Sequence, residues 1–342
     1  MSEGNGQEEM GSIRFPAEIL SVVAPDLSLK RHLDLGLRPC LRKFHEFKNL
    51  TLNVKSGLSR YDGDVDGESV TDSPVLGSSV IKSGNTTVIC GITGGIVEIA
   101  NVSTTTTSDD HDDSMEYTSI YPVVEISRGK LNGAPTDEEM ILSQQLYETL
   151  LHSKILPKKS LIIDNILLKT NDDTNNNNNN RKRYAFVLYA NIQVFSREGP
   201  LFDYCYGSLV KSLQTVKLPF IHFTDEEFII NDNRKNGGNV KPEIICDSEL
   251  YNQLKINEEN INWSLTFGLV NNDDGKETII LCDLEGHAEE TCCKSLINVI
   301  IDKNLKMRYL NIVGGDENVI IDENIVLKTV QLAKNRVNNI LN

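Results

Sequence analysis

The stretch from Tyr184 to Pro219 constrains the fold of this chain more than any other part of the sequence. It begins with an almost unbroken apolar run, residues 185–195, which contains a single polar pair, Asn191 and Gln193. Such a run predicts a strand that is buried on both faces, rather than a half-exposed strand with alternating polar and apolar residues. The rest of the chain is therefore expected to pack around this strand.

A turn and a helix follow the predicted strand. Residues 197–200 (Arg-Glu-Gly-Pro) predict the turn, because glycine accepts unusual backbone angles and proline ends a hydrogen-bonded ladder. From Leu201 onward the apolar residues recur at helical spacing, which predicts a helix that Pro219 ends. Its apolar face comprises Leu201, Cys205, Leu209, Leu213 and Val216. A buried strand that leads into a helix across a tight turn is a common place for a ligand site, although a plain core strand and core helix would have the same pattern.

The composition is that of a globular protein. The chain has 342 residues, of which 39% are hydrophobic and 24% charged, enough for two ordinary domains. It has no apolar run of about 18 residues, and its first ten residues are polar and acidic, so neither a membrane span nor a signal peptide is expected. The seven cysteines lie mostly in apolar stretches and form no Cys-x-x-Cys motif. They predict buried thiols in a reducing compartment, with no metal site.

The charge of the chain excludes one broad class of function. The formal net charge is −15, whereas an isolated nucleic-acid-binding domain is usually basic, because neutralising phosphates supplies most of its affinity. The chain by itself is therefore expected to be a poor general binder of RNA or DNA. Any contact with nucleic acid would be confined to a small patch within a larger assembly.

Composition shifts and turn signals divide the chain into five parts. They are a disordered acidic tail (1–15), an N-terminal helical arm (16–48), a first lobe (49–230), a linker (231–239) and a second lobe (240–342). Two low-complexity segments of the first lobe, 101–117 and 171–183, predict disordered loops. His111 stands among four aspartates in the first of these, but the spacing is not that of a metal-ligand set. The basic residues of the arm at 38–43 predict a solvated charge cluster.

Strands and helices alternate within both lobes. Residues 75–82 and 87–99 predict a hairpin around Gly84 and Asn85. Thr136 and Glu139 predict a capping box for a helix over 137–152. The second lobe is expected to contain strands at 243–246, 265–270, 278–282, 295–301 and 307–313, followed by a helix from Asp322. The predicted class is α+β, with two β-sheet lobes and helices packed on them.

Several motifs resemble a known family in order and spacing. The hairpin VLGSSVIKSGNTTVICGITGG (75–95) resembles the Gly-Ser … Gly-Asn-Thr-x-Val signature of the RNase PH family of phosphorolytic ribonucleases. Within that family the chain is most similar to the non-catalytic ring subunits of the eukaryotic RNA exosome. The similarity lies in LRPCLRKFHEFKN (37–49), GITGGIVE (91–98), TDEEMILSQ (136–144), SKILPKK (153–159) and VLYANIQVFSREGPLFD (187–203). It runs from about residue 16 to the C-terminus and is interrupted by the two low-complexity loops.

The resemblance implies an assembly and a cellular role. RNase PH-like subunits pair into dimers and form a six-membered ring with a central RNA channel, on which RNA-binding cap subunits dock. The expected partners are therefore other RNase PH-like subunits, cap subunits and RNA passing through the channel, without a membrane. The expected processes are ribosomal RNA maturation and RNA degradation in the nucleus, nucleolus and cytoplasm. No cofactor is implied.

The resemblance also indicates that the catalytic residues are lost. Active members hold phosphate partly with arginines on the helix that corresponds to 137–152, because an arginine fork matches the oxygens of a phosphate. This helix has no Arg or Lys here, and residues 144–147 read Gln-Gln-Leu-Tyr. Active members also carry two acidic residues at the end of the strand, and the corresponding positions are Ile192 and Glu198. Glu198 by itself is most simply a solvated surface charge, so no catalytic residue is expected.

Four basic residues remain as candidates for contact with RNA: Arg128, Lys130, Lys158 and Lys159. Each of them could equally be a surface charge or contact a neighbouring subunit. The nearby acidic loop around His111 would repel phosphate. The sequence thus favours an inactive structural subunit of the exosome ring. The alternatives are an active phosphate-dependent 3′-to-5′ exoribonuclease with a divergent site, or an acidic interaction protein of another kind.

Overall fold

The structure is a computed structural model. It describes residues 16–53, 58–61, 73–99, 120–129, 133–163, 183–223, 244–271, 278–315 and 319–341. The predicted acidic tail, the acidic loop, the linker and almost all of the asparagine-rich loop lie outside the described residues. Among the described residues, no helix is long and apolar enough to cross a membrane.

The chain forms two compact units. The smaller comprises Met1–Phe47, Thr266–Asn298 and Asn311–Leu332, and the larger comprises Lys48–Leu265, Val299–Leu310 and Ala333–Asn342. The N-terminal arm thus groups with part of the C-terminal sheet. These ranges differ from the lobes expected from the sequence, whose boundaries stay a prediction.

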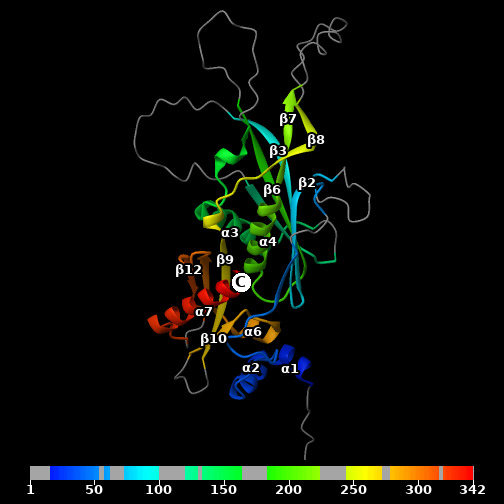
Figure 1. The fold of residues 1–342 in the computed structure, drawn as a ribbon. Coiled ribbons are helices and arrows are strands. Elements are labelled where there is room, and N and C mark those ends of the chain that lie inside the picture. The colour runs from blue at the N-terminus through cyan, green and yellow to red at the C-terminus, as the bar shows by residue number, and fades with distance from the viewer. Residues whose placement is uncertain are drawn as a thin grey trace, which may run out of the picture. The chain divides into compact units, whose positions relative to one another are not determined.

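A six-stranded sheet forms the centre of the larger unit (Figure 1). Its strands are β1 (Leu50–Asn53), β2 (Val75–Ser83), β3 (Thr86–Ile99), β4 (Ile120–Ile126), β5 (Ile162–Ile163) and β6 (Arg183–Ser196). The order is β1-β2-β3-β6-β4, with β5 also paired to β6. Only the β4–β6 pair is parallel among the pairs described in this sheet. The predicted hairpin is confirmed, with Gly84 and Asn85 as its two-residue turn.

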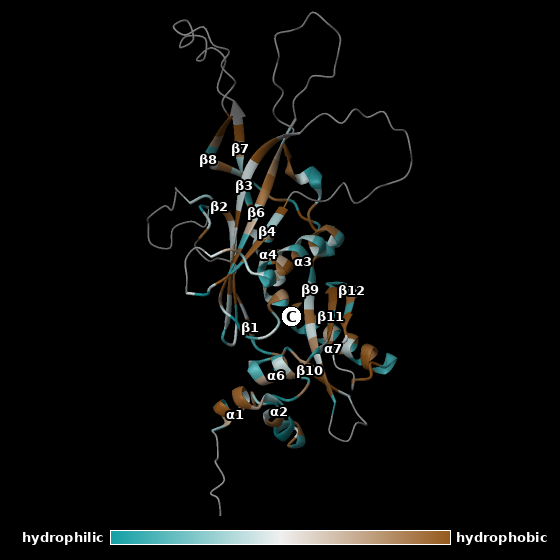
Figure 2. Ribbon diagram, turned by 180° about the vertical axis from the view of Figure 1, so that it is seen from behind, coloured by the Kyte–Doolittle hydropathy of each residue, from teal (hydrophilic) through white to brown (hydrophobic). Residues whose placement is uncertain are grey.

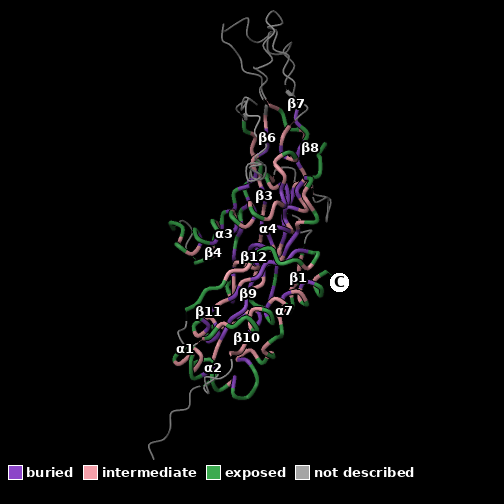
Figure 3. The backbone as a smooth tube through the Cα atoms, turned by 90° about the vertical axis from the view of Figure 1, so that its left-hand side faces the viewer, coloured by how far each residue is buried: buried purple, intermediate pink, exposed green. Residues whose placement is uncertain are grey.

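Two helices cover one face of this sheet. They are α3 (Asp137–Ser153) and α4 (Leu201–Thr215). α4 packs on β2, β3 and β6, while α3 packs on β4 and touches α4. Leucines at helical spacing on both helices lie in one continuous core with the sheet. Figure 3 colours the backbone by burial and shows buried residues along α4 and the sheet. The close approach of β2 to the end of α4 requires Gly77, since a Cβ atom there would lie 2.8 Å from Val216.

The prediction that residues 185–195 are buried on both faces is wrong. Over 188–195 buried and exposed residues alternate: Leu188, Ala190, Ile192 and Val194 are buried, while Tyr189, Asn191, Gln193 and Phe195 are exposed. The helices cover one face of β6 only. The alternation was hidden in the sequence because the exposed face of β6 carries the aromatic residues Tyr189 and Phe195. Figure 2 shows the hydropathy along β6 as a whole.

The end of α4 also differs from the prediction. The helix ends at Thr215, because Val216 has extended backbone angles (φ −61°, ψ 127°). Pro219 lies in strand β7 (Lys217–Phe223), which pairs with β8 (Ile244–Gln253) in a separate two-stranded sheet. The register shifts between Pro219 and Ile221. Such an irregularity accommodates a residue that has no N–H to donate to the ladder.

The C-terminal part of the chain has a four-stranded sheet of order β10-β9-β11-β12. Its strands are β9 (Asn262–Asn271), β10 (Thr278–Cys282), β11 (Ser295–Asp302) and β12 (Met307–Val313), and the chain continues into α7 (Glu323–Leu341). All of these were predicted, with boundaries that shift by a few residues. The remaining elements are α1 (Ala17–Val23), α2 (Pro25–Asp34), α6 (Gly286–Cys292), η2 (Lys158–Leu161) and η3 (Glu258–Asn260). The sequence did not indicate the short helix α6.

A buried ion pair in the smaller unit corrects another prediction. Arg38, expected in a solvated basic cluster, is fully buried together with Glu289. Its Nε donates to Glu289 Oε1 at 2.8 Å, and its Nη2 pairs with Oε2. Further donation to the carbonyls of Cys282 (2.5 Å) and Asp283 (3.1 Å) satisfies the guanidinium. A buried charge is stable only with such partners.

The core of the larger unit predicts which substitutions destabilise it. Leu209→Ala or Leu213→Ala should each lower the free energy of unfolding by about 2–5 kcal/mol, because both side chains are buried on the face of α4 that packs on the sheet. Denaturant unfolding of the full chain measures this. Ile141→Ala on α3 is the control, since its side chain is 56% exposed. Equal losses for the buried leucines and for Ile141 would contradict the assignment of this core.

Candidate functional site

The candidate site lies where the parallel strands β4 and β6 end. In this pair Ile126 lies opposite Val194, and the Ser127 N–H donates to the carbonyl of Val194 at 2.8 Å. Beyond these residues come Arg128 on one side and the turn with Glu198 on the other. Carboxyl ends of neighbouring parallel strands are a common location for ligand sites. The turn itself relies on Gly199, whose φ of +86° favours glycine.

Glu139 is at the centre of this region. Its Oε1 accepts the backbone N–H of Ile126 at 2.7 Å, and its Oε2 accepts the backbone N–H of Thr136 at 2.6 Å. Arg128 Nη2 donates to the same Oε2 at 2.5 Å. The Thr136 side chain accepts from the Glu139 backbone, so the predicted capping box is confirmed.

The surroundings of Glu139 keep it ionised. Burial raises the pKa of this carboxyl, but the hydrogen bonds from Thr136, Ile126 and Arg128 outweigh burial and lower the pKa to about 2. A negative charge also suits this position, because the first turn of a helix attracts anions. The ionised carboxylate of Glu139 therefore occupies the start of α3, where the backbone N–H groups could otherwise have bound an external anion.

The two arginines of this region are both paired with carboxylates. Arg128 is 43% exposed but bonded to Glu139, and Arg197 pairs with Glu138 at 2.6 Å. The first turn of α3 carries three acidic residues, Asp137 to Glu139. A phosphate approaching the start of α3 would meet these carboxylates, while the arginine charges nearby are already neutralised. The geometry does not favour the binding of an anion here.

The two positions that the resemblance relates to catalytic acids lie in different environments. Ile192 is buried in the middle of β6, between Cys90 and Val124 in register. Glu198 lies in the turn, where Thr86 Oγ1 donates to its carbonyl (2.7 Å) and accepts from its N–H (3.1 Å). Its Oε2 is buried and has no hydrogen-bond partner among the described residues. The interpretation of Glu198 as a fully solvated surface charge is therefore wrong for this oxygen.

The four candidates for RNA contact do not form one described site. Arg128 is bonded to Glu139, and Lys130 lies outside the described residues. Lys158 and Lys159 lie on η2, where Lys158 is half-buried and Lys159 exposed. Lys159 lines a cavity of about 930 Å³, to which Arg128 and Lys158 do not contribute. Their role in binding RNA stays a prediction.

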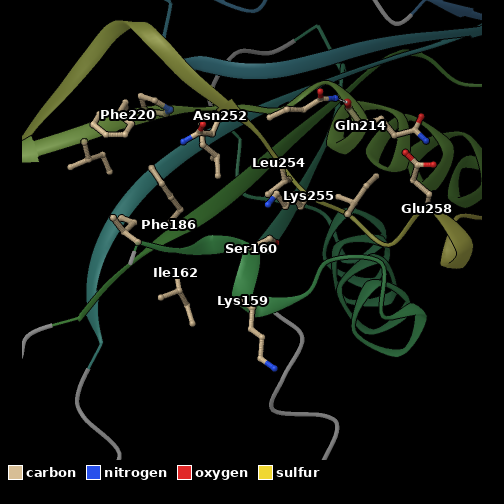
Figure 4. A pocket seen from close by; sticks show the side chains of 16 residues that line it. Lys159, Ser160, Ile162, Phe186, Gln214, Phe220, Asn252, Leu254, Lys255 and Glu258 are labelled. Carbon is tan, nitrogen blue, oxygen red and sulfur yellow. Dashed lines mark hydrogen bonds between the residues drawn. The ribbon is translucent and has the colours of Figure 1, made fainter. Parts of the chain in front are cut away.

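The sequence did not indicate this cavity (Figure 4). Phe186, Leu218, Ile221 and Leu254 contribute buried apolar surface, and Gln214, Asn252, Lys255 and Glu258 contribute polar groups. Figure 4 shows the Lys159 side chain pointing away from Asn252 and Gln214. The lining residues come from η2, β5, β6, α4, β7, the end of β8 and the segment that leads from β8 into η3. No local pattern links segments so far apart in sequence.

The fold and these strand ends define a class of protein. Residues 46–219, half of the chain, match domain 1 of the RNase PH family, which is described as a 3′ exoribonuclease family. The chain belongs to this family. The predicted α+β, RNase PH-like fold is thereby confirmed.

A curated relative and two solved structures are similar to this chain. The "Exosome complex component rrp43" of Schizosaccharomyces pombe is 26% identical over 259 residues, which cover 74% of this chain and 75% of the relative. The name of this relative agrees with the motifs of the sequence, which among exosome subunits most resemble those of ribosomal RNA-processing protein 43.

The two solved structures support the fold alone. An Archaeoglobus fulgidus exosome with RNA bound to the active site is 15% identical and matches with a TM-score of 0.59, covering 94% of this chain and 98% of that one. An archaeal exosome core is also 15% identical, with a TM-score of 0.55, covering 95% and 98%.

The hydrogen bonds of Glu139 generate a prediction about pH. Its pKa of about 2 lies below the ordinary value of 4.5. Ionised Glu139 therefore stabilises the fold above about pH 4.5, and this stabilisation is lost as the pH falls toward 2. At pH 7, Glu139→Gln should cost roughly 1–3 kcal/mol, because charge-assisted hydrogen bonds to buried donors are weakened. The difference from the wild type should narrow between pH 5 and pH 2.

Urea unfolding at a series of pH values measures this difference. Glu138→Gln is the matched control, since Glu138 is a neighbouring but exposed carboxylate. A gap between wild type and Glu139→Gln that stays constant down to pH 2 would contradict the role of the ionised carboxylate.

Proposed function

We infer that this chain is a catalytically inactive structural subunit of an RNA exosome ring. Its membership of the RNase PH family and its similarity to an exosome component over three quarters of that protein support this role. The likeness of its fold to archaeal exosome subunits is consistent with it.

The observation that carries the inactivity is the pairing of Arg128 with Glu139. Phosphorolysis transfers the terminal nucleotide of RNA to phosphate, so the enzyme must hold a phosphate with unneutralised donors beside the scissile bond. Here the first turn of α3 is acidic, Arg128 and Arg197 are neutralised, and α3 carries no Arg or Lys. Glu198 is a lone carboxylate, because the second acidic position is the buried Ile192.

Within a complex, the role of such a subunit is to complete the ring. The chain would occupy one position among six RNase PH-like subunits and help to dock the RNA-binding cap subunits. RNA would pass through the channel of the complex, which carries out 3′-to-5′ processing of ribosomal RNA and RNA turnover. We place the chain in the nucleus, nucleolus and cytoplasm on the same reasoning.

The inactivity generates a prediction about chemistry. Incubated with single-stranded RNA, phosphate and Mg²⁺, the purified chain should release no nucleoside diphosphates above background. Glu198→Ala should leave RNA degradation by any complex that contains the chain unchanged. Chromatography of the released nucleotides measures both. Phosphate-dependent release that disappears in Glu198→Ala would instead establish the alternative, an active exoribonuclease with a divergent site.

The ring role generates a prediction about assembly. Ring subunits leave apolar surface and strand edges for their neighbours to cover, so the chain alone should self-associate or precipitate. Co-expression with one specific RNase PH-like subunit of the same organism should give a stable heterodimer, detected by size-exclusion chromatography with light scattering. A monodisperse monomer with no affinity for any such subunit would contradict the role.

A further inference from the structure

Two tyrosines on the uncovered side of the large sheet and one tyrosine of α3 form a row of stacked rings. Tyr189 of β6 and Tyr121 of β4 lie opposite each other in register, and their rings stack with centroids 5.9 Å apart. Tyr121 also stacks on Tyr147 of α3, at 6.1 Å and an interplanar angle of 10°. All three belong to the larger unit. Tyr121 and Tyr189 are exposed, with 50% and 44% of their surface accessible, and Tyr147 is half-buried.

Among the residues that the structure describes, the exposed side chains of β4 and of residues 188–195 around this row carry almost no charge. We define the tyrosine face as eight residues. It comprises Tyr147 and the exposed residues of β4 and of segment 188–195 of β6, which are Tyr121, Val123, Glu125, Tyr189, Asn191, Gln193 and Phe195. Glu125 is its single charged residue. The other seven residues of the face are aromatic, aliphatic or amide side chains. The interiors of protein–protein interfaces are depleted of charge and enriched in aromatic residues in the same way.

The neighbouring edge of the sheet is closed to an added strand. β4 is an edge strand, and the N–H groups that point away from β6 belong to alternate residues. Pro122 has no N–H, the Val124 N–H donates to Ser143 Oγ at 3.0 Å, and the Ile126 N–H donates to Glu139 Oε1 at 2.7 Å. The donors that an incoming strand would need are thus absent or occupied. Over residues 122–126 of β4, packing on the face is therefore favoured over extension of the sheet.

The charge around the face decides between RNA and protein as the occupant. A row of exposed rings could stack nucleobases, but such sites combine stacking with basic residues that track the phosphates. The tyrosine face has no Lys or Arg, and Glu125 and the nearby Glu148, bonded to Gln144, would repel phosphate. Its lack of charge is complementary to an uncharged apolar protein surface.

We propose that the tyrosine face is the docking surface for an uncharged, apolar surface of a neighbouring RNase PH-like subunit. This inference rests on the proposed ring function and names the part of the chain that contacts the neighbour. A standard interface uses roughly 20–30 residues from each partner. The eight residues of the face therefore form the centre of the contact, where tyrosines commonly contribute most of the binding energy.

The test uses the full-length chain co-expressed with each RNase PH-like subunit of the same organism. For the subunit that the wild type captures, Tyr121→Ala/Tyr189→Ala should bind about 30-fold more weakly, as expected when central interface tyrosines are removed. Tyr121→Phe/Tyr189→Phe keeps the rings and should bind like the wild type. Asn191→Lys adds a charge to the face without removing packing and should also weaken binding. Tyr309→Ala, 51% exposed on β12, is the matched control and should have no effect.

The outcomes separate this inference from the function on which it rests. Thermal unfolding first establishes that each variant folds. If Tyr121→Ala/Tyr189→Ala does not fold, the binding of Asn191→Lys decides the test. If the wild type captures a subunit and both face variants capture it equally well, the docking surface is wrong while the ring function stands. Equal losses in Tyr309→Ala also overturn it. If the wild type captures no such subunit, both proposals fail. Binding of a labelled poly(U) oligonucleotide that disappears in the alanine variant would assign the face to RNA instead.

Discussion

The carboxylate of Glu139 is the interaction on which the described site depends. One buried side chain caps α3, accepts the backbone N–H of Ile126 at the edge of β4 and neutralises Arg128. The hydrogen bonds outweigh the cost of burying the charge, and the pKa falls to about 2. The bond from Ile126 also occupies one of the edge donors of β4, and the bond from Thr136 occupies a backbone N–H at the start of α3. The same carboxylate therefore stabilises the fold and gives the start of α3 a negative charge that disfavours the binding of an anion.

The smaller unit uses a related device. Arg38 and Glu289 are 251 residues apart in sequence and form an ion pair in the interior. The guanidinium of Arg38 also donates to two backbone carbonyls. Such a pair adds little net stability compared with apolar packing, but removing one partner would leave a buried charge without compensation. It therefore enforces one arrangement of the N-terminal arm against the segment that contains α6.

Two features suit a protein that acts by assembly. The arginines at the ends of β4 and β6 are paired with carboxylates, and the tyrosine face is exposed with a single charged residue. Binding RNA through phosphates needs cations, and the cations described near the site are bonded to carboxylates. The rings of Tyr121 and Tyr189 offer apolar area at little cost in conformational entropy, since a tyrosine has few rotatable bonds. Glu198 is an exception in this region, because its buried Oε2 has no hydrogen-bond partner among the described residues.

The sequence by itself determined the features that depend on neighbouring residues: the hairpin at Gly84 and Asn85, the capping box of Thr136 and Glu139, and the periodicity of α3, α4 and α7. The order of its motifs also indicated the family and hence the fold. The tertiary structure alone decided that β6 is covered on one face, that Arg38 is buried and that Pro219 lies in a strand. Each of these depends on what a segment packs against. Packing partners far away in the chain, such as Glu289 for Arg38 or the helices for β6, leave no mark on the local pattern, because the same residues satisfy more than one environment.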